Sequence, residues 1–198
     1  MIPDPVTLAG QWVTLEPLEP RHTTDLFAVA QDEDIWRYLP AAMPRTLAEM
    51  EVWTANALAV RDAGQMLPFA IVTRASGRAA GSTRYLDYSA LDRHIEIGWT
   101  WLGREWWRTP LNTECKYLLL RHAFEALGCI RVQLKTDLRN ERSQRAIERI
   151  GGVREGVLRK AVIVPKDGHQ RWSAYYSLLD DEWPAVKARL EHRMSAES

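Results

Sequence analysis

The segment HIEIGWTWLGREWWRTPLNTECKYLLLRHAFEALG, residues 94–128, places a strand pattern, a short turn and a helix pattern in direct succession. In residues 94–101 apolar and polar side chains alternate, which predicts a strand with one core face and one free face. Glu96 lies on the face that the alternation leaves free. The opposite, core face is predicted to carry Ile95, Ile97, Trp99 and Trp101.

The second half of this segment has the spacing of a helix. From Leu111 to Leu127 apolar residues recur at intervals of three and four, and Gly128 provides a C-terminal cap. Only a short turn joins the strand to this helix. The helix N-terminus is therefore expected beside the end of the strand.

The residues that follow repeat the order of strand and helix. A strand at 131–136 leads to Asn140, which can cap a helix that Gly151 ends. Strand, helix, strand and helix in this order imply a crossover connection and one parallel strand pair. After it we expect a hairpin of strands 156–164 and 171–179, and a helix over 181–193.

Upstream of residue 94 the pattern is that of shorter elements. We expect strands at 12–17, 68–73 and 79–86, and helices at 23–30 and 46–62. No internal repeat or Gly-, Ser- or Pro-rich linker divides the chain. The sequence predicts one mixed α/β (α+β) domain over residues 1–198, with a mostly antiparallel sheet and helices on both faces.

Composition and charge exclude several classes of protein. Lys plus Arg and Asp plus Glu both number 26, so no net field draws the chain to nucleic acid or an anionic membrane. Residues 103–176 nevertheless carry 15 basic and 8 acidic side chains. This excess suits an anionic cofactor, and equally a solvated surface without a common purpose.

Other residue types bear on location and metal binding. Cys115 and Cys129 are widely spaced, which favours buried free thiols in a reducing compartment. The first residues lack the basic and apolar segments of a secretory signal, and we expect a cytoplasmic protein. The five histidines show no metal-ligand spacing, so a metal site is not expected.

Three separated segments carry a resemblance to a known family. These are residues 94–128, RVQLKTDLRNERSQRAIERIGGVREGVLRK at 131–160, and DGHQRWSAYYSLLDDEWPAVKARL at 167–190. In order and spacing they resemble the GCN5-related N-acetyltransferase (GNAT) superfamily, and especially its ribosomal-protein N-terminal acetyltransferase branch. The resemblance implies a fold in which two parallel strands splay apart at the cofactor site. It also implies acetyl-CoA as co-substrate.

The resemblance also implies which residues hold the cofactor. In the family, backbone amides at the turn into the helix bind the CoA pyrophosphate, but the matching positions Trp107, Pro110 and Asn112 depart from the usual motif. A helix N-terminus still offers free N–H groups and a positive dipole end to an anion. The candidate residues at this turn are Arg108, Thr109, Leu111, Asn112 and Thr113. An ordinary loop with proline at the first helical position is the alternative.

Further cofactor contacts follow from the same resemblance. The backbone of Thr100, Trp101 and Leu102 would bind the pantetheine amides. Asn140 and Ser143 match the family's residues at the start of the next helix, where the Asn side chain meets the cofactor arm. A plain helix cap is the alternative for Asn140.

Acetyl transfer to an amine requires an unprotonated nucleophile and a proton for the leaving thiolate. Glu96 is the candidate base, acting directly or through water, because it lies mid-strand on the free face and resembles the glutamate found at this place in the branch. A solvent-facing strand carboxylate is the alternative. Many relatives carry a Tyr that acts as the general acid where this chain has Ile147. Ser143 is the nearest substitute, and water or direct loss of the thiolate would also suffice.

The sequence thus predicts an acetyl-CoA-dependent N-acetyltransferase acting on a primary amine, either a protein N-terminus or a small molecule. A non-catalytic CoA-binding sensor on the same fold is the alternative, because the pyrophosphate motif is degenerate and the Tyr is missing. A nucleic-acid binder using residues 103–176 is a third option. Trp106 or Trp107 could line the acceptor channel. A homodimer through the late strands fits the pattern, although no residue decides it.

Overall fold

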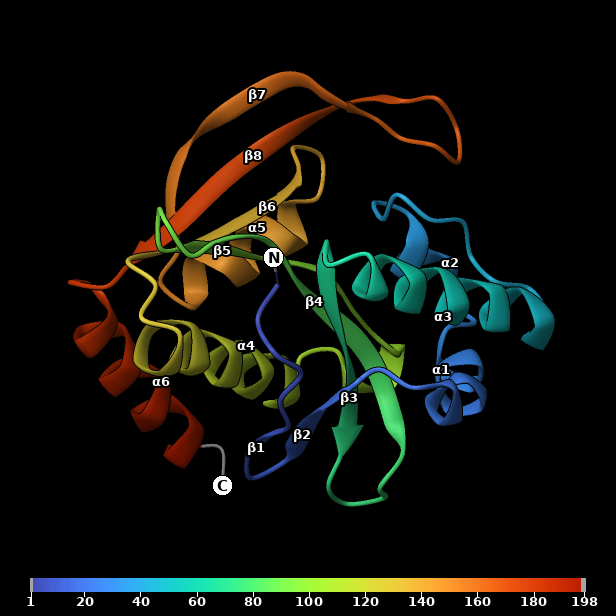
Figure 1. Cartoon of the computed structure of the whole chain (residues 1–198), viewed down its shortest axis with the longest axis horizontal. Helices are drawn as coiled ribbons and strands as arrows, with labels where there is room; N and C mark the ends of the chain where they lie inside the picture. Colours follow the sequence, from blue (N-terminus) through green and yellow to red (C-terminus); the bar gives the residue numbers. More distant parts are fainter. Residues whose placement is uncertain (1, 197–198) are drawn as a thin grey trace.

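The structure is a computed structural model that describes residues 2–196. Eight strands form one sheet in the order β1-β2-β3-β4-β5-β6-β8-β7 (Figure 1). Every neighbouring pair is antiparallel except β5 and β6, which are parallel. The predicted mixed sheet with a single crossover is confirmed. The predicted domain spans 1–198, of which residues 1 and 197–198 lie outside the described part.

The strands and helices have the following bounds. The strands are β1 Leu8–Ala9, β2 Val13–Pro17, β3 Met66–Thr73, β4 Ala79–Ser89, β5 His94–Leu102, β6 Arg131–Asp137, β7 Val153–Ile163 and β8 Gln170–Leu179. The helices are α1 Thr23–Val29, α2 Glu33–Trp36, α3 Leu47–Asp62, α4 Leu111–Arg121, α5 Glu141–Arg149 and α6 Trp183–Ala196. Short 3₁₀ turns occupy Pro20–His22 and Arg104–Trp106.

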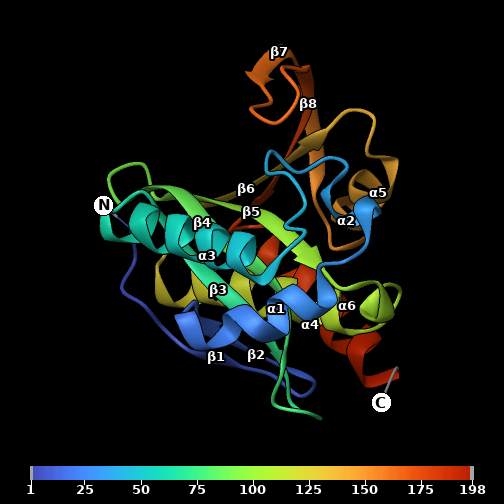
Figure 2. The same cartoon turned by 90° about the vertical axis from the view of Figure 1, so that its right-hand side faces the viewer.

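Each face of the sheet has its own hydrophobic core. Figure 2 shows α3 and α1 in front of the sheet, with α4 and α6 beyond it. The core beneath α4, α5 and α6 includes Phe69, Ile97 and Leu118. The core beneath α1, α2 and α3 is smaller and is built around Trp36, Trp53 and Trp101. Alternate strand residues thus feed opposite cores, as the pleat requires.

The predicted alternation of β5 is wrong at its second half. Ile95 and Ile97 face the α4 core, but Trp101 belongs to the α3 core. Between the pairs Arg84–Gly98 and Ser82–Trp101, β5 contains one extra residue, and Trp99 has a positive φ of 53°. This is a β-bulge, and it moves the side chains that follow it to the other face.

Close packing of β4 on β5 accompanies the bulge. A Cβ on Gly81 would lie 2.1 Å from the carbonyl oxygen of Trp101 and 2.9 Å from the Cα of Leu102. Only glycine fits this approach of two backbones. The bulge is therefore a built feature of the sheet.

Two other elements differ in detail from the sequence prediction. The helix predicted over 111–127 is α-helical to Arg121 and then forms a π-helical turn, His122–Ala126, before Gly128 at φ +64°. The β7–β8 hairpin is longer than predicted and arches over the top of the molecule in Figure 1. Among the described residues, no helix has the length and apolar character of a membrane span.

Candidate active site

The parallel strands β5 and β6 separate beyond Glu96. They pair only from His94–Arg131 to Glu96–Gln133, whereas β6 continues to pair with β8 as far as Asp137. Among residues 2–196, the second half of β5 therefore has no strand neighbour on the side away from β4. Unpaired backbone groups in an extended strand can bind the amides of an extended ligand.

Thr100, Trp101 and Leu102, the predicted pantetheine contacts, lie on this open stretch of β5. The Leu102 carbonyl already accepts a hydrogen bond of 2.9 Å from the Trp107 indole. The Thr100 hydroxyl is bonded to Thr83 at 2.8 Å and to the Lys116 ammonium at 2.5 Å. The side chain of Thr100 is thus occupied, and its contribution to a ligand would come from the backbone.

The turn into α4 presents free backbone donors. Within residues 2–196, the amides of Arg108, Thr109, Asn112 and Thr113 make no hydrogen bond, while the first helical bond runs from Glu114 N to Pro110 O. Leu111 N has a weak partner, the Thr109 hydroxyl at 3.4 Å. The turn is half-buried or exposed as far as Asn112, and Arg108 adopts a positive φ of 63°. A helix N-terminus with several free amides is suited to a phosphate group.

An arginine that the sequence reasoning missed lies beside this turn. The Arg142 guanidinium, from the first turn of α5, stacks 3.7 Å from the centroid of Trp107. Arg104 also approaches Trp107, at 5.7 Å, and pairs with Asp32 at 2.7 Å. Among the described residues Arg142 has no carboxylate in ion-pair contact, and the carboxylates of Asp34 and Asp32 act on its charge only at longer range. The stacking on Trp107 brings the start of α5 against the loop 103–110.

Glu96 is buried rather than solvent-facing, with 1% of its surface exposed. Its Oε2 accepts 2.8 Å from Gln133 and lies 2.9 Å from the Lys135 ammonium. Its Oε1 has no hydrogen-bond partner among residues 2–196 and lies 3.2 Å from the position of a Cβ on Gly98. One carboxylate oxygen is thus held by two side chains, and within the described residues the other has no hydrogen-bond partner. The alternative of an ordinary surface carboxylate is wrong.

At the start of α5, Asn140 forms a helix cap, and its contact with the cofactor arm stays a prediction. Its Oδ1 accepts 3.1 Å from Ser143 N, which makes it a helix cap. The Asn140 amide nitrogen has no partner within the described residues and could still meet a ligand. Ser143 is half-buried and its hydroxyl is likewise unpaired there, whereas Ile147 is buried in the α4 core.

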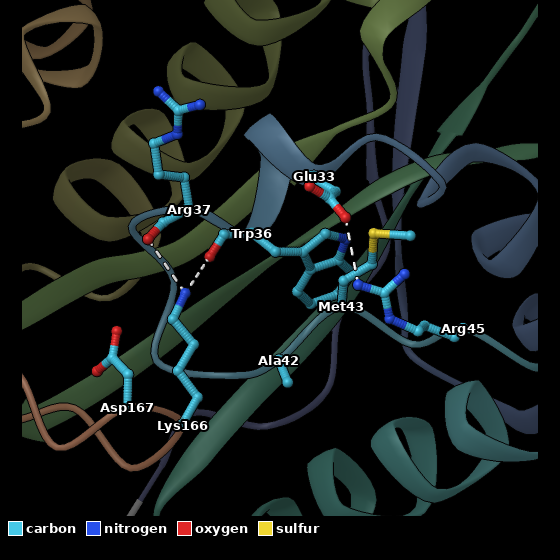
Figure 3. Close-up of a pocket in the computed structure, with 8 residues that line it drawn as sticks. All are labelled: Glu33, Trp36, Arg37, Ala42, Met43, Arg45, Lys166 and Asp167. Carbon is cyan, nitrogen blue, oxygen red and sulfur yellow. Dashed lines mark hydrogen bonds and ion pairs between the residues drawn. The ribbon is translucent and has the colours of Figure 1, made fainter.

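The α3 face of the site is aromatic. The rings of Trp36, Trp53 and Trp101 contact one another, with centroids 5.3 to 6.3 Å apart. Trp36 also lines a cavity of about 360 Å³ between α2 and the tip of the β7–β8 hairpin. Figure 3 shows the Lys166 ammonium at this tip pointing toward the carbonyls of Trp36 and Arg37. The hairpin thereby closes one side of the cavity.

A family model for the acetyltransferase (GNAT) domain matches residues 13–153. The chain belongs to the GNAT acetyltransferase family. The crystal structure of a GCN5-related N-acetyltransferase from Brucella melitensis has a TM-score of 0.90 and 33% identity, covering 96% of this chain and 86% of that one. A protein from T. thermophilus, provisionally assigned as an acetyltransferase, is 42% identical with a TM-score of 0.86, covering 98% of this chain and 99% of that one.

The Bacillus subtilis protein YdaF, provisionally assigned as a ribosomal N-acetyltransferase, is 32% identical over 111 residues. The match spans 56% of this chain and 59% of YdaF. The predicted GNAT family and fold are confirmed, and the domain is of the acetyl-CoA-dependent N-acetyltransferase type. The likeness to YdaF agrees with the predicted ribosomal-protein branch. The roles of single residues stay predictions.

The free amides and the open strand fit acetyl-CoA as the co-substrate of a GNAT domain. The turn at Arg108–Thr113 would take the pyrophosphate, and the backbone of Thr100 and Trp101 would take the pantetheine arm. Arg142 could not be found from the GNAT motif, because its position depends on how α5 packs. The sequence signal that remained was the excess of basic residues in 103–176.

Proposed function

We propose that this GNAT protein transfers an acetyl group from acetyl-CoA to a primary amine, in a ternary complex and without a covalent acyl-enzyme. The acceptor is a small-molecule amine or the N-terminus of a peptide. The main support is the row of unpaired amides at the N-terminus of α4, next to the open second half of β5 that leads to Glu96. An anion site and an extended-ligand site thus meet at a buried carboxylate.

In this proposal Glu96 takes a proton from the incoming ammonium group, through Oε1 or an intervening water. The amine nitrogen then attacks the thioester carbonyl, so that a C–N bond forms and the C–S bond breaks. Lys135 and Gln133 hold Oε2 and fix the orientation of the carboxylate. A free backbone amide of β5 can stabilise the oxyanion.

The leaving sulfur departs as a thiolate and needs a proton. The nitrogen loses its second proton as the tetrahedral intermediate collapses, and the hydroxyl of Ser143 at the start of α5, or water in its place, is proposed to relay that proton to the sulfur. Asn140 is proposed to contact the cofactor arm through its amide nitrogen while its oxygen caps the helix. A cytoplasmic location and a homodimer also remain predictions.

Thiol release tests the proposal directly. Mixing the protein with acetyl-CoA and a panel of amines and peptides is expected to release free thiol with at least one acceptor, above the rate of acetyl-CoA hydrolysis. Isothermal titration is expected to show binding of acetyl-CoA. No binding at millimolar concentration would sink the proposal.

The alternative of a non-catalytic CoA-binding sensor keeps one specific support. The turn into α4 has Pro110 in place of an amide donor, and Ile147 occupies the position of the usual acidic Tyr. Tight CoA binding together with no thiol release across the whole panel would favour the sensor.

A further inference from the structure

Two buried donors in the described residues lack any hydrogen-bond partner, and both belong to side chains that contact the same aromatic ring. They are Arg84 Nε and Trp101 Nε1. Trp53 lies between them, 5.3 Å from the Arg84 guanidinium and 5.9 Å from the Trp101 ring. Native proteins leave few buried donors unpaired, and each one that remains calls for an explanation such as strain, a catalytic role or a bound water or ion.

Arg84 is a buried cation without a counter-ion. It belongs to β4, is 4% exposed, and forms no ion pair within residues 2–196. Its guanidinium lies 4.3 Å from the Trp99 ring, and within the same residues its only side-chain hydrogen bond runs from one terminal nitrogen to the Met66 sulfur at 3.6 Å. Burial lowers its pKa to about 10, so it stays charged at neutral pH. An arginine in this state has most of its donors available for an anion.

The position of Arg84 places it beside the proposed base. Arg84 is the cross-strand partner of Gly98, and the free oxygen of Glu96 lies over Gly98 at 3.2 Å from a Cβ there. Arg84, Gly98 and Glu96 therefore share the α3 face of the sheet. A molecule with its amine at Glu96 could extend along this face of the sheet toward Arg84.

The cavity beneath the hairpin is joined to this arrangement by aromatic contacts. Its Trp36 wall lies 5.3 Å from Trp101 and 6.3 Å from Trp53, the two rings that neighbour the unpaired donors. Figure 3 shows Arg45 beside Glu33 and Lys166 turned toward backbone carbonyls, so these cavity charges already have partners. Arg84, which has no ion pair within residues 2–196, does not line this cavity.

We propose that the acceptor amine carries a carboxylate a few bonds from its nitrogen, and that Arg84 and the Trp101 indole bind this carboxylate. The proposal rests on the proposed function and specifies its substrate class. Arginine binds a carboxylate through parallel N–H donors, and aromatic walls strengthen such a pair by excluding water. The carboxylate could be the main-chain group of a free amino acid or the side chain of an N-terminal Asp or Glu in a peptide.

Matched acceptors test the proposal. The probes are the twenty L-amino acids, their C-terminal amides, and tripeptides that begin with Asp, Asn, Glu or Gln, each with acetyl-CoA in the thiol-release assay. At least one acid is expected to exceed its amide counterpart in kcat/KM by tenfold or more. Preference for the free amino acids, or for the Asp and Glu peptides, identifies the source of the carboxylate. Equal use of acids and amides across all pairs would overturn the proposal.

Variants of Arg84 distinguish binding of the carboxylate from simple packing. Arg84→Met keeps the length of the side chain and is expected to raise KM for the preferred acid at least tenfold, with little change for its amide. Arg84→Lys is expected to recover part of the loss. Arg78→Met, on the exposed turn before β4, is the matched control and should change neither. An equal loss for acid and amide in Arg84→Met would mean that Arg84 only packs against the tryptophans.

A binding measurement keeps this proposal distinct from the proposed function. Tryptophan fluorescence of the CoA-loaded protein is titrated with the N-acetylated amino acids and their amides. Binding of an acid that Arg84→Met abolishes would support the carboxylate site even if no thiol release occurs. Thiol release with amides and acids alike would support the enzyme and overturn the carboxylate site.

Discussion

The two faces of the sheet are built to different rules. The face beneath α4, α5 and α6 is closed, and its polar groups are paired: Glu114 accepts three backbone N–H groups and Lys116 donates to Thr100. The face beneath α1, α2 and α3 contains both of the unpaired buried donors found in residues 2–196, Arg84 Nε and Trp101 Nε1. The α4 face therefore contributes mainly to stability, whereas the α3 face keeps donors that a ligand could bind.

This difference teaches how the GNAT sheet serves two purposes at once. Core packing requires that buried donors be satisfied, whereas a binding site must keep some donors free until a ligand arrives. The bulge at Trp99 lies where these requirements meet, because it sends Thr100 to the α4 side and Trp101 to the α3 side. Five substitutions or pH changes probe the contrast.

The largest effect is expected from Glu96→Gln on the α3 face. The amide keeps the size of the side chain but cannot accept a proton, so kcat/KM should fall by about 10²- to 10⁴-fold. Steady-state thiol release measures this, and a thermal melt checks folding. Glu125→Gln, whose carboxylate pairs with Lys187 far from β5, is the control. An unchanged rate in Glu96→Gln would show that Glu96 is not the base.

A substitution in the closed face should lower the stability of the protein rather than its catalytic rate. Leu118 of α4 is 1% exposed, and Leu118→Ala should lower the free energy of unfolding by about 2 to 5 kcal/mol, since it removes buried contacts and leaves a cavity. Urea unfolding measures this. The variant is expected to keep its KM for acetyl-CoA while folded. A loss below about 1 kcal/mol would show that this core is loosely packed.

A pH effect distinguishes the buried lysine of the closed face. Burial lowers the pKa of Lys116 to about 8, well below the ordinary value for an unfolded chain. At this site the unfolded state thus binds more protons above pH 8, and Lys116 by itself should raise the free energy of unfolding by about 1 kcal/mol between about pH 8 and pH 9, measured as the difference between wild type and Lys116→Met. Burial also raises the pKa of Cys115 to about 11, and because an unfolded thiol ionises at about pH 8.5, this opposes the contribution of Lys116 within the same pH window.

Lys116→Met checks the assignment of that rise. Chemical unfolding of the variant across the same pH range should show no increase at its lower end. If the free energy of unfolding still increases with pH in Lys116→Met, another group is responsible for the increase. Burial of the Lys116 ammonium then does not destabilise the protein.

Arg142, at the edge between the two faces, should have a smaller and salt-dependent effect on the KM for acetyl-CoA. Arg142→Ala removes a cation next to the free amides of the α4 turn, so KM for acetyl-CoA should rise about fivefold with little change in kcat. The difference should shrink at high ionic strength, because exposed charges are screened. Arg145→Ala, one turn away and paired with Glu141, is the control. A change in kcat alone would contradict a role of Arg142 in binding acetyl-CoA.

The smallest change in stability is expected from Arg84→Met. Replacing a buried, unpaired cation by an apolar side chain of similar length removes a desolvation cost, which offsets the lost contact with Trp99. Its free energy of unfolding should stay within about 1 kcal/mol of the wild type, or exceed it. Chemical unfolding measures this. A loss as large as that of Leu118→Ala would make Arg84 a structural residue and erase the contrast between the faces.

Much of this architecture could be predicted from the chain alone. The alternation in 94–98 and the spacing of three and four in 111–121 specify a strand followed by a helix, because each depends on neighbouring residues only. The helix N-terminus after the strand, and with it the candidate phosphate site, follows from this order. Asn140 as a cap also follows, since its partner Ser143 is three residues away.

The bulge, the burial of Glu96 and the isolation of Arg84 depended on packing between distant elements. Whether Trp101 faces α3 or α4 is decided by one extra residue relative to β4, which no local pattern records. Glu96 is held by Gln133 and Lys135, and Arg84 is enclosed by Trp53 and Trp99, from separate elements of the chain. Sequence by itself determined the order of elements and the family, because local spacing and short motifs suffice for these. The tertiary structure decided which polar groups find partners, because a partner is a property of positions brought together in space.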